Sequence, residues 1–336
     1  MTDLQPAIHR FRLEIPMTPA CHATRPHRRR TAVPLACATF LLLGSGIASA
    51  QDAAALDAPA EEPSLQDPPP ASSGKLLLTG GVTQVEGAAG GGLTPWAVIG
   101  GNGTRDQIGG SAYYTRVDVG DYALDSYGAL LGIRDRVELR VARQDFATRA
   151  VGAALGLGQG YVIRQDIIGL KVKLAGDAVL EQDRWMPQLA IGLQRKRNNR
   201  GALLSAIGAR DDSGTDVYLS ATKLYLDQSL LLNTTVRFTK ANQFGILGFG
   251  GDRNSSYKPQ FEGSAAFLLN RHVAVGAEFR SKPDNLGIAR EDNVWDAFVA
   301  WAPNKHVSLT VAYVDLGNIV IRDHQRGWYA SLQVGF

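Results

Sequence analysis

Four polar residues in two adjacent pairs are the ones whose types could carry out hydrolytic chemistry: Asp211 with Asp212, and Asp323 with His324. A histidine beside a carboxylate can take a proton from water, and an acidic pair can hold that water in position. Neighbouring residues on an extended chain point to opposite faces, however, so neither pair must converge on one site. The same residue types are common in solvated loops. The sequence therefore favours a structural role for both pairs and predicts no enzyme.

The cysteines and histidines of the sequence do not form a pattern that would bind a metal ion or a cofactor. Both cysteines, Cys21 and Cys37, lie in the first fifty residues. The later histidines are His272, His306 and His324, and the first two sit beside short turns while the third lies in a long loop. Zinc would therefore lack its usual ligand set. We expect no metal ion and no cofactor.

The first fifty residues have the three parts of a secretory signal peptide. A basic HRRR at residues 27–30 precedes an apolar run at 31–43, and residues 48–50 read Ala-Ser-Ala. We predict a leader and signal peptide over residues 1–50, with Met17 as a candidate for the true start. The whole chain has a formal net charge of +3. The leader carries this basic excess, so we expect no binding to nucleic acid.

Two regions of different composition follow the leader. Residues 51–74 are rich in Ala, Pro, Asp and Glu and contain few large apolar side chains. Such a stretch cannot bury enough surface to offset the entropy of ordering, so we predict a disordered periplasmic segment. Residues 75–336 have the length and composition of one folded domain.

The last ten residues alternate between apolar side chains and small or polar ones, which is the period of a strand with two unlike faces. The apolar row includes Trp328, Leu332, Val334 and the terminal Phe336. This ending resembles the C-terminal signal by which bacterial outer-membrane β-barrels are recognised for assembly. The resemblance implies that barrel-assembly machinery and periplasmic chaperones are partners during biogenesis. It also implies that outer-membrane lipid and lipopolysaccharide surround the assembled protein.

Strands with the same alternation recur along the domain, and no helical face persists. Short connections alternate with long polar ones, which is typical of outer-membrane barrels. The sequence therefore predicts an all-β fold: a transmembrane antiparallel up-and-down β-barrel of about 14 strands, or about 12 if the Gly-rich entry at 86–92 contributes none. The predicted strands are 75–85, 93–101, 107–117, 124–133, 136–143, 164–174, 186–195, 215–225, 229–239, 259–269, 272–280, 293–302, 306–316 and 326–336.

The polar faces of these strands carry charged residues in mid-strand, where a water-filled lumen solvates them more easily than an apolar core. Aromatic residues near strand ends, Trp96 and Trp295 among them, are typical of girdles at the membrane surfaces. No loop is long enough to form a folded plug domain. The residues predicted to line the lumen are Glu138, Arg140, Lys171, Lys173, Arg237, Glu262, Glu278 and Arg280.

Three segments carry a resemblance to a known group. They are VEGAAGGGLTPWA at residues 85–97, AYYTR at 112–116 and GDYALDSYG at 120–128. They resemble a family of bacterial proteins catalogued only as a domain of unknown function, over roughly residues 80–336. The resemblance implies an outer-membrane barrel and nothing about a substrate, so no functional residue is carried over.

The sequence leaves three functional hypotheses. The first is a passive pore for small solutes, with the inward charges setting its selectivity. The alternative is a non-conducting barrel, closed by internal salt bridges, that acts as a structural or interaction protein through its external loops. The third is a protease of the omptin group, in which an acidic pair such as Asp211–Asp212 would face Asp323–His324 across the outer rim.

Overall fold

The structure, a computed structural model, describes residues 74–336. The predicted signal peptide and almost all of the predicted disordered segment lie outside the described residues. Among residues 74–336, neither α-helix is long and apolar enough to cross a membrane.

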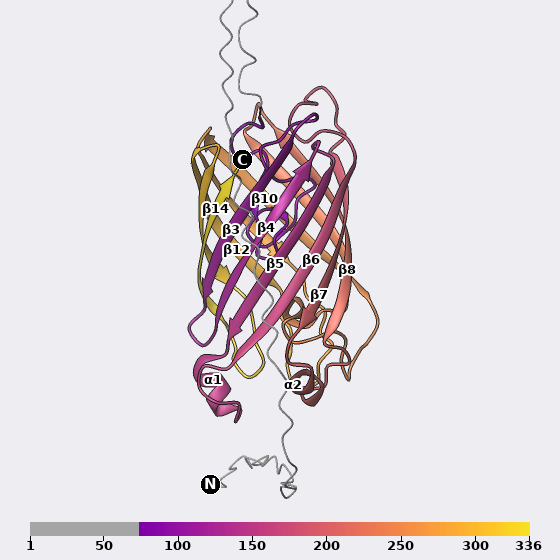
Figure 1. Cartoon of the computed structure of the whole chain (residues 1–336), viewed down its shortest axis with the longest axis vertical. Helices are drawn as coiled ribbons and strands as arrows, with labels where there is room; N and C mark the ends of the chain where they lie inside the picture. The colour runs from indigo at the N-terminus through magenta and orange to yellow at the C-terminus, as the bar shows by residue number, and fades with distance from the viewer. Residues whose placement is uncertain (1–73) are drawn as a thin grey trace, which may run out of the picture. The chain divides into compact units, whose positions relative to one another are not determined.

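Twelve antiparallel strands close into a barrel, each paired with its neighbours in the chain, and the last strand pairs with the first (Figure 1). The strands are β3 (Ile108–Asp118), β4 (Ala123–Ile133), β5 (Val137–Ala147), β6 (Val162–Ala175), β7 (Gln188–Asn198), β8 (Ser213–Tyr225), β9 (Leu230–Thr239), β10 (Lys258–Asn270), β11 (Val273–Arg280), β12 (Val294–Asn304), β13 (Val307–Asp315) and β14 (Arg326–Gly335). Closure pairs both edges of every strand. A strand in hydrocarbon requires this because no water is present to bond free backbone groups.

Alternation along each strand separates an apolar outer face from a polar inner one. In β9, Leu232 and Phe238 are exposed on the outside, whereas Asn233 and Arg237 are buried inside. A soluble barrel would place its apolar face inward, so the exposed apolar band marks a surface that faces lipid. The fold class predicted from the sequence, a transmembrane β-barrel, is confirmed, with 12 strands rather than 14.

The difference of two strands lies at the start of the domain. The predicted strands 75–85 and 93–101 do not belong to the barrel wall; this prediction is wrong. Their region forms only the small hairpin strands β1 (Val82–Thr83) and β2 (Ala89–Gly90). Residues 82–100 are buried on every side, so they have no row of side chains to present to lipid. Trp96, predicted to lie in an aromatic girdle, is likewise buried.

The two ends of the barrel differ in their connections. Short turns join the strands at one end, apart from a longer link at 176–187; we call this the turn end, which faces the periplasm in barrels of this type. The opposite loop end carries the longer connections, three of which contain short helices: α1 (Arg149–Ala154), α2 (Gly201–Ala206) and the 3₁₀ turn η1 (Asn242–Gly245).

The predicted assembly signal lies on the outer face of β14, from Trp328 near the loop end to Phe336 at the turn end. The side chains of Trp328, Leu332, Val334 and Phe336 all point outward and are about half exposed or more. The backbone of Phe336 exchanges two hydrogen bonds with Gly110 of β3, at 2.9 and 3.0 Å, and so helps to close the barrel.

We expect Phe336→Ala to lower the amount of barrel assembled in cells severalfold while leaving the stability of refolded protein nearly unchanged. The Phe336 side chain is 67% exposed, so its removal costs few internal contacts, and its backbone bonds remain. Assembled barrel can be measured by heat-modifiable gel mobility in membranes, and stability by urea unfolding in detergent. Equal loss in both measurements would mean that Phe336 is a packing residue and not a signal.

Candidate functional site in the barrel lumen

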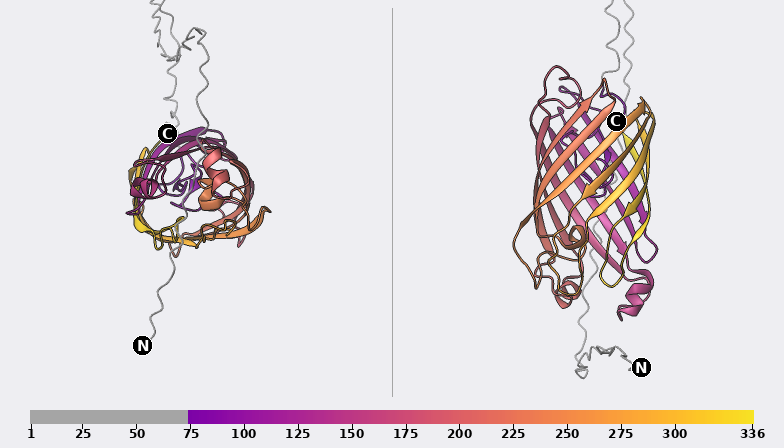
Figure 2. Two further views of the ribbon diagram at one scale, coloured as in Figure 1. Left: turned by 90° about the horizontal axis from the view of Figure 1, so that it is seen from below. Right: turned by 180° about the vertical axis from the view of Figure 1, so that it is seen from behind.

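The lumen is filled by the chain's own N-terminal segment, residues 74–107, which we call the plug. Seen from the loop end, the plug lies inside the ring of strands (Figure 2). It enters and leaves at the turn end, where the backbone N–H of Lys75 donates to Asn102 at 3.1 Å and that of Asn102 donates to Phe336 at 3.2 Å. The plug is therefore a hairpin with both ends at the same rim.

Glycines allow the plug to approach the wall closely. Gly87 has a φ of +89°, a left-handed conformation that favours glycine. At Gly91, a Cβ atom would lie 2.0 Å from a carboxylate oxygen of Glu278 on β11. The Gly-rich run at 86–92 is thus the place where the plug backbone contacts wall side chains.

A plug carboxylate, Glu86, is the centre of the first charged cluster. It contacts three wall cations: Lys196, Arg280 at 2.9 Å and Arg237 at 3.6 Å. All of these side chains are at least nine-tenths buried. Buried charges are stable only when they are paired, so Glu86 ties the plug to wall strands β7, β9 and β11.

Wall carboxylates complete this cluster. Glu262 pairs with Arg237 and with Arg280 at 3.2 Å. Asp216 pairs with Lys196 at 2.9 Å and accepts a hydrogen bond from Thr239 at 2.5 Å. The three wall cations thus have two wall carboxylates, and the third carboxylate comes from the plug.

A second cluster holds the other side of the plug through its backbone. The ammonium of Lys171 donates to the carbonyls of Ala89 at 3.0 Å and Trp96 at 3.1 Å, and it pairs with Glu138 at 3.0 Å. Glu138 in turn accepts from the backbone N–H of Gly100 at 3.0 Å. These contacts pin the plug hairpin to β5 and β6.

Glu278 forms a third attachment. It accepts hydrogen bonds from the backbone N–H of Leu93 at 2.6 Å, from Thr94 at 2.5 Å and from Ser264 at 3.0 Å. Its cross-strand neighbour Asp296 is also buried, and neither oxygen of Asp296 has a hydrogen-bond partner among the described residues.

The loop end is closed by the connection between β9 and β10. The carbonyl of Phe244 accepts from Lys196 at 2.9 Å, and Gly245 accepts from Asn198 at 2.5 Å. Apolar side chains of the same connection pack with those of α1, α2 and β13. Below them remains an apolar cavity of only about 30 Å³.

A buried ion pair fastens this closure to the next loop. Glu291 lies 2.9 Å from Lys282 and accepts from the backbone N–H of Gln243 at 2.9 Å. Burial raises the pKa of Glu291, and the neighbouring Lys282 ammonium opposes that shift.

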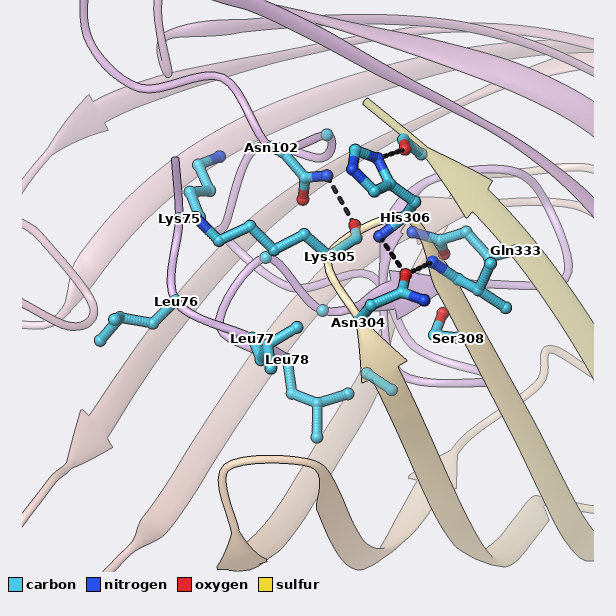
Figure 3. Close-up of a pocket in the computed structure, with 16 residues that line it drawn as sticks. Lys75, Leu76, Leu77, Leu78, Asn102, Asn304, Lys305, His306, Ser308 and Gln333 are labelled. Atoms are coloured by element: carbon cyan, nitrogen blue, oxygen red, sulfur yellow. Dashed lines mark hydrogen bonds between the residues drawn. The ribbon is translucent and has the colours of Figure 1, made fainter. Parts of the chain in front are cut away.

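The turn end is more open. A pocket of about 40 Å³ lies there, in which the side chain of Asn102 donates to the carbonyl of Lys305 at 2.6 Å. Lys75 and His306 lie beside this hydrogen bond (Figure 3). A larger cavity of about 280 Å³ is lined by plug residues such as Leu76 and Val98 and by residues of the 176–187 link such as Asp177 and Leu180.

Lys173 lies near this end and not at the charged centre. It pairs with Asp135 at 2.9 Å and with Asp177 at 3.5 Å. Burial would raise the pKa of Asp177, but the backbone N–H groups of Leu180 and Val179 donate to it and hold its pKa below the ordinary value.

The structure places the predicted lumen-lining residues as follows. The side chains of Glu138, Arg140, Lys171, Arg237, Glu262, Glu278 and Arg280 are buried within the barrel, and that of Lys173 is mostly buried near the turn end. Three members of the network were not predicted, Glu86, Lys196 and Asp216, and the buried Asp296 beside Glu278 was not predicted either. Extending the predicted strand 186–195 by one residue would have found Lys196. The predicted strand 215–225 already contains Asp216, and its alternation places Asp216 on the inward face. Nothing in the sequence marks Glu86 as an internal residue.

The residues of the hydrolytic hypothesis are not brought together by any described contact. Asp211 pairs with Lys240 at 2.7 Å. Among residues 74–336, the imidazole of His324 donates to no carboxylate, and its backbone N–H donates to the side-chain oxygen of Asn318 at 3.1 Å. Within residues 74–336, no group of three His, Cys, Asp or Glu side chains could hold a metal ion.

The fold and its interior define a class: a transmembrane β-barrel whose lumen is occupied by its own N-terminal segment. The sequence profile of the family described as "Protein of unknown function (DUF3034)" matches residues 79–333. The chain belongs to this family, which confirms the resemblance seen in the sequence. No match is found among curated proteins.

Three of the solved structures that this chain resembles have low sequence identity to it. An outer membrane channel from Pseudomonas putida F1 is 12% identical, with a TM-score of 0.41, over 70% of this chain and 96% of that one. The NanC porin is 9% identical, with a TM-score of 0.39, over 68% and 98%. Outer membrane phospholipase A from Escherichia coli is 8% identical, with a TM-score of 0.36, over 68% and 92%. No function is transferred from any of them.

Proposed function

We propose that the protein is an outer-membrane channel for small hydrophilic solutes that is closed by its plug and opens when the plug leaves the lumen. The proposal keeps the pore for small solutes expected from the sequence and adds the plug as its gate. It includes export by the predicted signal peptide and insertion into the outer membrane with the turn end facing the periplasm.

The observation that carries this proposal is the position of the two plug ends. Residue 75 and residue 102 are hydrogen-bonded to each other at the turn end, next to the carboxyl terminus. A hairpin held at one rim can withdraw toward the periplasm without threading through the barrel. Withdrawal would leave a lumen lined by the wall charges of β5 to β11.

The chemistry of the wall supports the same proposal. In a core that stays filled, replacing buried ion pairs with apolar residues is often neutral or stabilising. Arg140, Lys171, Arg237 and Arg280 nevertheless face inward at nearly complete burial. Such a lining suits an interior that is filled by protein in one state and by water in another.

A reversible cross-link between plug and wall tests the proposal. Thr94 of the plug and Ser264 of β10 lie with their hydroxyl oxygens 2.6 Å apart, so two thiols there are close enough to form a disulfide. We expect the Thr94→Cys/Ser264→Cys protein to be silent in planar bilayers when oxidised. Reduction should restore conductance steps like those of the wild type, which conducts whenever its plug withdraws.

The matched controls are the two single-cysteine variants, which cannot form the cross-link and should conduct under oxidising and reducing conditions alike. Equal conductance of the oxidised and reduced double variant would mean that the plug is not the gate. Silence of the wild type and of the reduced variant at all voltages would favour the second candidate.

That second candidate is a non-conducting barrel with a structural or interaction role. It is favoured by one observation: the loop end is closed by packed apolar side chains around Phe244 as well as by the plug. In this case the plug is a permanent part of the core, and the external loops are the active surface.

A further inference from the structure

The outer face of the barrel changes character at one level on strands β5 to β8, which lie side by side (Figure 1). Toward the loop end, the outward-facing residues of these strands are charged or carry a hydroxyl group. On each strand, the next outward-facing residue toward the turn end is aliphatic. The pairs along the four strands are Arg143 and Val141, Asp166 and Ile168, Arg195 and Leu193, Thr215 and Val217. Because charged residues are costly in hydrocarbon, this boundary marks the head-group level of the outer leaflet.

Two arginines at this boundary, Arg195 and Arg197, differ from the other charged residues because they have no carboxylate partner among the described residues. Arg143 pairs with Asp166 at 2.5 Å, and Arg164 pairs with Asp145 at 2.7 Å. Within the described residues, Arg195 makes no ion pair and donates only to the hydroxyls of Ser213 and Thr215, at 2.8 and 3.4 Å. Arg197 stands directly opposite Asp166 in the register, but Asp166 is held by Arg143, and no described residue bonds to the Arg197 side chain.

The surroundings of the two arginines are amphiphilic. Both side chains are exposed on the outside of β7. Ile168, Leu193 and Val217, which are 66%, 45% and 37% exposed, lie next to them on the side of the membrane interior. A ligand that fits must therefore carry anionic groups above an acyl chain.

We propose that Arg195 and Arg197 bind the phosphate groups of an outer-leaflet glycolipid of the lipid A class, with its acyl chains along Ile168, Leu193 and Val217. Charge complementarity carries this inference, because two guanidinium groups without carboxylate partners offer planar forks that match phosphate oxygens. It rests on the outer-membrane location in the proposed function but not on conduction. A barrel that never conducts would still have this lipid site.

Native mass spectrometry of the purified barrel in detergent, with bisphosphorylated lipid A as the probe, tests the site. We expect Arg195→Gln/Arg197→Gln to weaken lipid A binding by about tenfold or more, because each charge-assisted hydrogen bond to phosphate is lost. The matched control is Arg134→Gln/Arg136→Gln, which removes two exposed arginines from the opposite, turn end and should leave binding unchanged.

Two further arms identify the source of the phosphate. Dephosphorylated lipid A should bind the wild type no better than it binds the double variant, and inorganic phosphate should not displace lipid A. Equal loss of binding in the turn-end control, or equal affinity of the wild type for the phosphorylated and dephosphorylated lipids, would overturn the proposal. Should the double variant not fold, Arg197→Gln alone removes a side chain with no described partner, and unchanged lipid binding by it would count against the site.

Discussion

Glu86→Gln is expected to turn a closed barrel into one that opens frequently. Glutamine keeps the size of the side chain but removes the charge that faces Lys196, Arg237 and Arg280. Removing one partner of a buried ion pair costs roughly 3–5 kcal/mol. In a withdrawn state the wall cations are hydrated, so the cost falls on the plugged state alone. The equilibrium for plug withdrawal should rise by about two to nearly four orders of magnitude.

The measurement is the open frequency of single barrels in planar bilayers, with hydrogen exchange of the amides at 82–100 as a second readout that needs no conduction. Glu262→Gln is the matched control, because Glu262 pairs with Arg237 and Arg280 but with no plug residue. We expect it to change the open frequency much less. If both variants behave alike, the plug is not held by the charge of Glu86.

Lys171→Met is expected to release the other side of the plug. The substitution removes the ammonium donor from the carbonyls of Ala89 and Trp96, of which only that of Ala89 keeps a second donor among the described residues, and it removes the nearest cation from Glu138. The cost of uncovering a buried charge is again roughly 3–5 kcal/mol. Amides at 89–100 should therefore exchange with solvent about a hundredfold faster or more, while those of the barrel strands keep their protection.

Lys173→Met provides the control for this substitution. Lys173 is the same residue type two positions further along β6, and it pairs only with Asp135 and Asp177. Its loss should leave exchange at 89–100 nearly unchanged. The double variant Lys171→Met/Glu138→Gln should recover part of the protection, since it removes both charges of the pair. Without such recovery, the effect of Lys171→Met would be attributable to packing and not to charge.

The wall of the barrel could be predicted closely because each of its strands carries its own signal. Residues 229–239 were predicted as a strand, and β9 spans Leu230–Thr239. The inward charges Arg237 and Glu278 follow from the same period of two. Errors arose at strand ends: β7 was predicted to end at residue 195, so the inward Lys196 was counted as part of a loop.

The plug could not be recognised for a physical reason. Residues 75–85 and 93–101 have the length and the apolar content of strands, and periodicity does not say what an apolar side chain touches. Trp96 on a wall strand would meet lipid, whereas in the structure its indole N–H donates to Ser264 at 2.9 Å inside the barrel. The sequence is compatible with both arrangements.

The sequence by itself determined the fold class, the registers of inward and outward faces and the presence of charge inside the barrel, since all of these follow from local alternation. Only the tertiary structure decided that the lumen is filled, because this depends on contacts between segments far apart in the chain. Glu86 meets Arg280 across 194 positions, and Leu93 meets Glu278 across 185. Pairing at such separations depends on closure of the barrel. Closure places residues that are far apart in the sequence together in the lumen, and no local sequence pattern shows that they meet.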